Sequence, residues 1–209
     1  MNVLEVYEAA GIDSLPTDPA AAARVLGIKV VSFKSVAEVY GKTERELYNY
    51  SRLGFSFRDE RGLVIAINGN SCGERRRRFT LAHELGHCVL GHLEGDFTDG
   101  IRERKADGFA AEFLAPLAVL DCCRVSGARE IALMCGISQS AAEIAFDKLS
   151  KKRREGFDFL ENSVDSAIVK RFERFITRYV SSETSDMESF KSKALLRQMA
   201  DCRKTGGSR

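Results

Sequence analysis

The stretch FTLAHELGHCVLGH, residues 79–92, contains all three histidines of a chain of 209 residues. They are His83, His87 and His92. On a helix, His83 and His87 stand four positions apart, so both side chains project from the same face about one turn apart. Two imidazoles placed in this way can bind one small cation together. The helices and strands around this stretch must therefore hold it as a helix that presents both imidazoles to one cation.

The five residues HELGH form the pattern H-E-x-x-H, which on a helix is a metallopeptidase signature. In this pattern Glu84 does not bind the metal but takes a proton from the attacking water. Gly86 leaves room for close packing at the site. The preceding Ser71-Cys72-Gly73-Glu74 fits a capping box. We therefore predict one helix that begins there and ends near Gly91.

Two histidines leave a site incomplete, because a catalytic zinc has three protein ligands and one open position. His92 follows His87 by five residues, one short of the extended motif H-E-x-x-H-x-x-G-x-x-H. On a helix that spacing turns the ring about 140° away, and closing the helix C-terminus is the other role open to His92. Glu103 is the better candidate, because it follows a loop long enough to reverse the chain. Weaker candidates lie in that loop: Glu94, Asp96 and Asp99.

Asp107 supports the choice of Glu103. The two are four residues apart in ERKAD, so they share one helix face. Asp107 can accept a hydrogen bond from the outer nitrogen of a ligand histidine and fix its tautomer. Glu112 points to the opposite side of that helix. We predict a zinc site formed by His83, His87 and Glu103, with Asp107 behind it.

The wider sequence resembles a known family. FTLAHELGHCVLGH followed by ERKADGFAAEFLAP is similar to the ImmA/IrrE metallopeptidases, as is the preceding ERRRRFTLAHELGH. The resemblance covers about Ile28 to Leu149 and implies the same three zinc ligands, with Glu84 as catalytic base. One departure is small: Ala115 stands where the family more often has methionine before the proline.

The resemblance also implies a function. It indicates a zinc-dependent endopeptidase with a narrow protein substrate, a helix-turn-helix transcriptional repressor of the Cro/CI type. A single cleavage of that repressor would release the genes it silences. Nothing in the composition or spacing of the sequence indicates that substrate. The alternative is a DNA- or repressor-binding regulator that uses the metallopeptidase scaffold without efficient cleavage.

The elements around the metal helix predict an α+β fold. It is a zincin-like core with a small, mostly antiparallel sheet packed on the HExxH helix, followed by a helical C-terminal region. GLVIAIN directly precedes the metal helix, and it is either the edge strand that pairs with an extended substrate or an interior strand. The predicted strands are 28–33 and a hairpin of 52–59 with 62–68. The predicted helices include 1–10, 18–26 and 101–114.

We predict three parts of the chain. Residues 1–126 form the metallopeptidase core, 127–150 a helix-turn-helix-like element, and 151–209 a helical extension with a disordered tail, KTGGSR. Residues 129–149 have helix-turn-helix spacing, which fits DNA binding in the major groove. A helical packing element inside the peptidase is the favoured interpretation. The run Arg75–Arg78 is interpreted as solvated arginines with packed stems or as a contact for acidic substrate groups.

Composition narrows the class of protein. The chain is 44% hydrophobic and 30% charged, with a net charge of +2, so no whole-chain electrostatic argument favours nucleic acid or membrane. No signal peptide is recognisable, and no run of about 18 apolar residues could span a membrane. Six cysteines without C-x-x-C spacing indicate reduced thiols. We therefore expect a soluble cytoplasmic protein.

Overall fold

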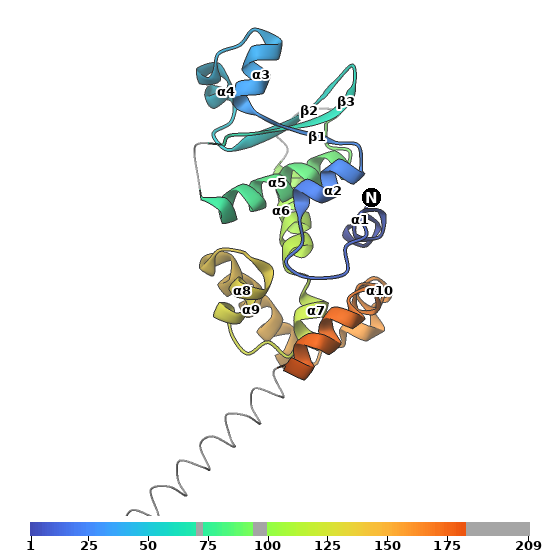
Figure 1. Cartoon of the computed structure of the whole chain (residues 1–209). Coiled ribbons are helices and arrows are strands. Elements are labelled where there is room, and N and C mark those ends of the chain that lie inside the picture. Colours follow the sequence, from blue (N-terminus) through green and yellow to red (C-terminus); the bar gives the residue numbers. More distant parts are fainter. Residues whose placement is uncertain (70–72, 94–99, 183–209) are drawn as a thin grey trace, which may run out of the picture.

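The computed structural model describes residues 1–69, 73–93 and 100–182 and places a small sheet above a helical body (Figure 1). The α+β class and the helical C-terminal region are confirmed. The strands are β1 (Lys29–Ser32), β2 (Gly54–Asp59) and β3 (Gly62–Ile67). The helices are α1 (Val3–Ala10), α2 (Pro19–Val25), α3 (Phe33–Tyr40), α4 (Glu44–Tyr50), α5 (Glu74–Val89), α6 (Gly100–Leu114), α7 (Leu117–Cys122), α8 (Ala128–Cys135), α9 (Gln139–Arg154), the 3-10 helix η1 (Phe159–Glu161) and α10 (Ser163–Arg171). Residues 173–182 are helical as well.

The sheet is mixed, with the strand order β1-β3-β2. β2 and β3 form the predicted antiparallel hairpin, with Asp59 opposite Gly62 at the turn. β1 runs parallel to β3, because the chain between them passes through α3, α4 and β2. β3 is therefore the central strand, and the prediction that GLVIAIN is the substrate-pairing edge is wrong. Its buried run Val64–Ala66 fits an interior strand that is covered on both faces.

Two helices that the sequence analysis did not predict, α3 and α4, lie above the sheet, and α5 lies below it (Figure 1). Ser32 caps α3 by accepting a hydrogen bond from the amide of Ser35. Thr43 and Glu46 form a capping box at the start of α4, a signal that was readable in the sequence. The two helices share a small apolar cluster with the sheet: Phe33, Val36, Leu47 and Ala66.

Helix α5 begins later than predicted. Its N-cap is Gly73, whose extended backbone (ψ 162°) precedes the first helical residue, Glu74. The predicted capping box at Ser71 lies outside the described ranges, as do the loop carboxylates Glu94, Asp96 and Asp99 and the tail KTGGSR. The predicted end is confirmed, because Gly91 takes a left-handed conformation (φ 71°) just beyond Val89.

Glycines let α5 approach both of its neighbours closely. A Cβ on Gly86 would lie 3.0 Å from Cδ1 of Phe109 and 3.3 Å from the carbonyl oxygen of Ala106, so α5 and α6 pack nearly backbone to backbone there. On the other side, a Cβ on Gly54 of β2 would lie 2.9 Å from Cγ2 of Thr80. The metal helix is therefore held tightly between the sheet and α6.

The C-terminal helices share the main core with the N-terminal part. Tyr7 of α1 packs against both Phe113 and Phe172, at ring-centroid distances of 5.4 and 5.2 Å. Buried apolar side chains of this core run from α1 through α5 and α6 to the end of α10. The helix-turn-helix-like pair α8 and α9 contributes to it through Ile131 and Leu149. The residue boundaries of the three predicted parts stay a prediction.

Arg78 links α8 to the metal helix. Its guanidinium donates to the carbonyl oxygens of Thr17, Cys135 and Gly136, so it neutralises the C-terminal end of α8. Gly136 has φ 62°, and a Cβ there would collide with Nη1 of Arg78. The interpretation of the four arginines as solvated side chains is therefore wrong for Arg78.

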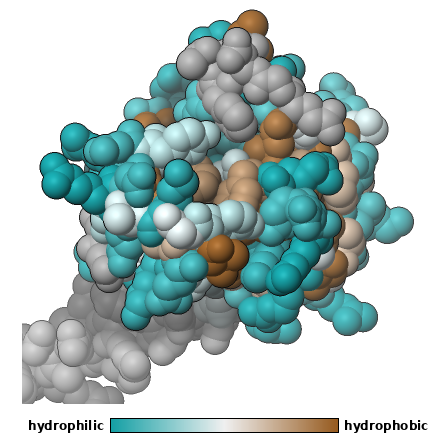
Figure 2. All heavy atoms as spheres, turned by 90° about the horizontal axis from the view of Figure 1, so that it is seen from above, coloured by the Kyte–Doolittle hydropathy of each residue, from teal (hydrophilic) through white to brown (hydrophobic). Residues whose placement is uncertain are grey.

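The surface over α3 and α4 is mostly hydrophilic, with hydrophobic residues in small, separate groups (Figure 2). Such scattered apolar residues are ordinary on a globular protein. Within the described ranges, no helix has both the length and the apolar character needed to cross a membrane.

Candidate metal centre

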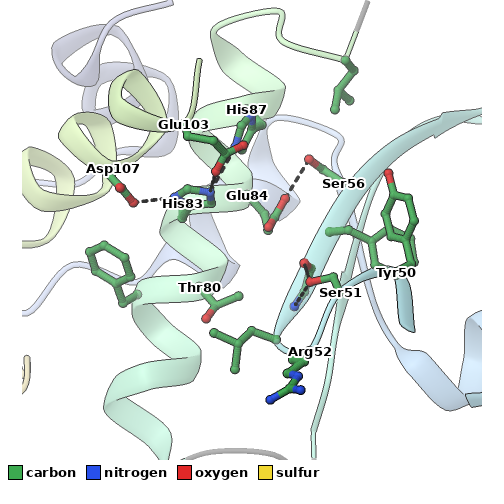
Figure 3. A pocket seen from close by; sticks show the side chains of 15 residues that line it. Tyr50, Ser51, Arg52, Ser56, Thr80, His83, Glu84, His87, Glu103 and Asp107 are labelled. Atoms are coloured by element: carbon green, nitrogen blue, oxygen red, sulfur yellow. Dashed lines mark hydrogen bonds and ion pairs between the residues drawn. The ribbon is translucent and has the colours of Figure 1, made fainter. Parts of the chain in front are cut away.

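The predicted ligands converge at the junction of α5 and α6. His83 and His87 project from one face of α5, and Glu103 comes from the first turn of α6 (Figure 3). Nε2 of His83 lies 3.3 Å from Oε2 of Glu103, and Nε2 of His87 lies 3.3 Å from Oε1 of the same carboxylate. The two Nε2 atoms are 3.0 Å apart. One ligand atom from each residue falls within 4.8 Å of the others.

This donor set fits a zinc ion. Ligand bonds of about 2.1 Å in a tetrahedral site separate neighbouring ligand atoms by about 3.4 Å, close to the spacing of the three side chains. Two imidazole nitrogens and one carboxylate oxygen are also donors that zinc accepts. The half-exposed carboxylate of Glu103 leaves one side of the cluster open to solvent.

Each histidine has a partner on its outer nitrogen. Nδ1 of His83 donates a hydrogen bond of 2.9 Å to Oδ1 of Asp107, which is the predicted contact. Nδ1 of His87 lies 3.3 Å from Nδ1 of His92. His92 therefore stands behind His87 and does not belong to the cluster. Its backbone amide donates to the carbonyl oxygen of His87, so it closes the end of α5 as expected.

Burial shifts the pKa of two groups at this centre. Burial, with the nearby His83 ring as second cause, lowers the pKa of His87 to about 4, so this imidazole is neutral at pH 7. A neutral imidazole is the form that binds a metal. Burial also raises the pKa of Glu84, a buried carboxyl whose side chain points from α5 towards β2 (Figure 3).

A cavity of about 570 Å³ opens over these residues. One wall is the chain entering β2, from Tyr50 to Ser56, and the other is the face of α5 and α6 that carries His83, Glu84 and Glu103. The sheet edge and the carboxyl–imidazole cluster therefore face each other across one open space (Figure 3).

Residues 23–139, more than half of the chain, match the family model of the IrrE N-terminal-like domain, peptidase family M78. The chain belongs to this family. No curated protein matches it. A metallopeptidase family implies a bound metal ion. Among the described residues, His83, His87 and Glu103 form the group that could hold it.

One residue of this M78 family member was missed by the sequence analysis. Ser56 of β2 is buried, and its hydroxyl donates a hydrogen bond of 2.9 Å to Oε2 of Glu84. In β2 it stands between Phe55 and Phe57, so the strand alternation turns it to the other face of the sheet, towards α5. A small polar residue on that inward face was the available signal, but the spacing alone does not reveal its partner.

Two further titratable residues lie apart from the centre. Glu112 does not line the metal cavity, which agrees with its predicted position on the opposite side of α6. Cys88 follows His87 but is buried, and burial raises the pKa of its thiol to about 12. The thiolate needed for metal binding or redox chemistry is therefore disfavoured, and Cys88 behaves as the small core residue that was expected.

Proposed function

We propose that this M78 family member is a zinc-dependent endopeptidase. His83, His87 and Glu103 bind the zinc ion, Asp107 orients His83, and Glu84 is the general base. The observation that carries the proposal is the convergence of two imidazoles and a carboxylate, from α5 and α6, beside a buried carboxyl group. Family membership supports the hydrolytic chemistry.

The proposed roles follow from what each group can do. Zinc, when bound, lowers the pKa of a water molecule and polarises the peptide carbonyl. Glu84 takes the proton from the attacking water and delivers it to the leaving amine. Burial raises the pKa of Glu84, which makes its carboxylate a stronger base towards that water than an exposed glutamate would be. The hydroxyl of Ser56 holds Oε2 and so directs the carboxylate into the cavity.

The substrate peptide lies along the free edge of β2. β2 pairs only with β3 in the described sheet, so its outer backbone groups are available for pairing with an extended chain. The N-terminal part of this strand lines the same cavity as Glu84 and His83. An edge strand beside the metal cluster is therefore the support for an extended, main-chain-bound substrate.

The proposed substrate is a cytoplasmic helix-turn-helix repressor of the Cro/CI type, a proposal that rests on the resemblance of the sequence to the ImmA/IrrE peptidases. Direct DNA binding by α8 and α9 has less support. The first turns of α9, which would enter the major groove, carry the exposed carboxylates Glu143 and Asp147, and these repel phosphates.

The test uses the full chain and the purified repressor encoded beside its gene. We expect zinc-loaded protein to cut the repressor once, a chelator to abolish the cut, and Glu84→Gln to retain zinc without cleaving. Zinc-loaded protein that leaves the repressor intact would contradict the proposed substrate. Cleavage at the wild-type rate by Glu84→Gln would contradict the proposed base.

A further inference from the structure

A second groove lies between α6 and α9 on the helical body. Its volume is about 610 Å³. Small residues leave room for it on the two helices and just after the end of α6: Gly108, Ala111, Ala115, Ala141 and Ala145. Ile144 of α9 lies on its wall with 59% of its surface exposed, so a large apolar side chain remains uncovered there. Such a groove offers apolar contact to a chain that lies between the two helices.

This groove adjoins the metal cavity. Phe79 and Asp107 line both spaces. Asp107 is also the residue that bonds to His83, so the boundary between the two spaces lies directly behind the proposed zinc ligands. A polypeptide that crosses the metal centre along β2 and continues past Phe79 would reach the groove next.

Glu112 is the acidic group in the groove that is placed to receive a cation. It lies half-buried at the wall, where Lys148 and Arg104 also line the groove, and among the described residues no side chain forms an ion pair or hydrogen bond with its carboxylate. Burial, and then the nearby carboxylate of Asp165, raise its pKa to about 7, although Lys148 and Lys152 act in the opposite direction. A carboxylate in such surroundings is stabilised by a cation that comes close enough to pair with it.

We propose that this groove binds a segment of the protein substrate outside the scissile bond, with apolar side chains against α6 and α9 and a lysine or arginine side chain on Glu112. The inference rests on the proposed function, because the occupant is the substrate of the neighbouring cavity. The shared walls, Phe79 and Asp107, place the groove next to that cavity and favour the substrate over a second copy of the chain. Binding in the groove would make the groove a determinant of substrate specificity, because it selects a substrate by the sequence of this segment and not by the residues at the bond that is cut.

Peptide binding tests the groove without cleavage. Full-length Glu84→Gln protein is titrated with three fluorescent peptides. The first carries two leucines followed by an arginine. The second has glutamate in place of that arginine, and the third has serines in place of the two leucines. We expect the leucine–arginine peptide to bind best, and Ile144→Arg to weaken it about tenfold. Glu112→Gln should remove most of the preference for arginine over glutamate. The matched control is Leu133→Arg, since Leu133 is 69% exposed on α8 and does not line the groove.

The outcomes distinguish a failure of the groove proposal from a failure of the proposed catalytic function. Equal binding of the three peptides, or an equal loss with Leu133→Arg, would overturn the groove as a binding site. With the repressor as substrate, Ile144→Arg should raise KM about tenfold and leave kcat and zinc content unchanged. An unchanged KM in a protein that cuts would overturn the groove alone. Absence of cutting by the wild-type protein would overturn the proposed function, while the peptide titration still decides whether the groove binds.

Discussion

The hydroxyl of Ser56 donates a hydrogen bond to Oε2 of Glu84 at 2.9 Å, and so joins the edge strand of the sheet to the proposed catalytic base. The strand proposed to pair with the substrate therefore has a fixed position relative to the proposed base. The same hydrogen bond opposes burial by lowering the pKa of Glu84. Ser56 is in this account a positioning residue with a measurable electrostatic effect.

Replacing Ser56 tests that role. In Ser56→Ala the lost hydrogen bond lets the pKa of Glu84 rise further, so the acidic limb of the kcat/KM profile should move to higher pH. We expect kcat to fall about tenfold while zinc content stays at the wild-type level. Ser140→Ala, on the exposed surface of α9, is the matched control. An unshifted acidic limb would show that Ser56 does not influence the base.

Asp107 should govern how tightly the metal is held. Its carboxylate accepts the hydrogen bond from Nδ1 of His83. Asp107→Asn keeps the size of the side chain but loses its charge, and we expect zinc affinity to fall about 10- to 100-fold in competition with a chelator. Lys105→Gln, on the same helix but away from the histidines, is the control. Equal affinities of Asp107→Asn and wild-type protein would remove Asp107 from the metal site.

Gly86 should be required for the packing of α5 on α6. In Gly86→Ala the new methyl group meets Phe109 at 3.0 Å, so we expect a loss of about 1–3 kcal/mol in the free energy of unfolding. Gly108→Ala is the matched control, because a Cβ there meets nothing within 4 Å. That variant should be neutral or more stable by up to about 1 kcal/mol. Urea denaturation of both proteins gives the comparison, and equal stabilities would refute the tight contact.

Glu112 should make stability depend on pH. Its pKa is about 7 in the folded protein against 4.5 for an ordinary glutamate, so the folded state binds the proton more tightly. The resulting stabilisation is complete below about pH 4.5 and is lost as the pH rises through 7. Glu112→Gln should remove up to about 3 kcal/mol of this dependence between pH 5 and 8.5. Urea denaturation at both pH values tests this, and an unchanged dependence in the variant would contradict it.

Local spacing predicted much of the site. The positions of His83 and His87 on one helix face, and of Glu103 and Asp107 on the next, follow from helical periodicity, and the structure brings all four together. The hairpin of β2 and β3 was also readable, because its turn and its alternation are local in sequence.

Features that depend on long-range contacts were not predictable in this way. The central place of β3 arises from its parallel pairing with β1, which is far from it in sequence. The same holds for Ser56 beside Glu84, and for Arg78 at the end of α8. Helix α4 is a different case, since the capping box of Thr43 and Glu46 was present in the sequence and was overlooked.

The central claim is that one zinc ion is bound by His83, His87 and Glu103. The most direct measurement is the zinc content of purified full-length protein, by mass spectrometry of the metal, for the wild type, Glu103→Ala and the control Glu155→Ala, whose side chain lies at the end of α9. We predict one zinc per chain in the wild type and in Glu155→Ala, and well below one zinc per chain in Glu103→Ala, because that variant lacks one of the three ligands. One zinc per chain in Glu103→Ala would contradict the account.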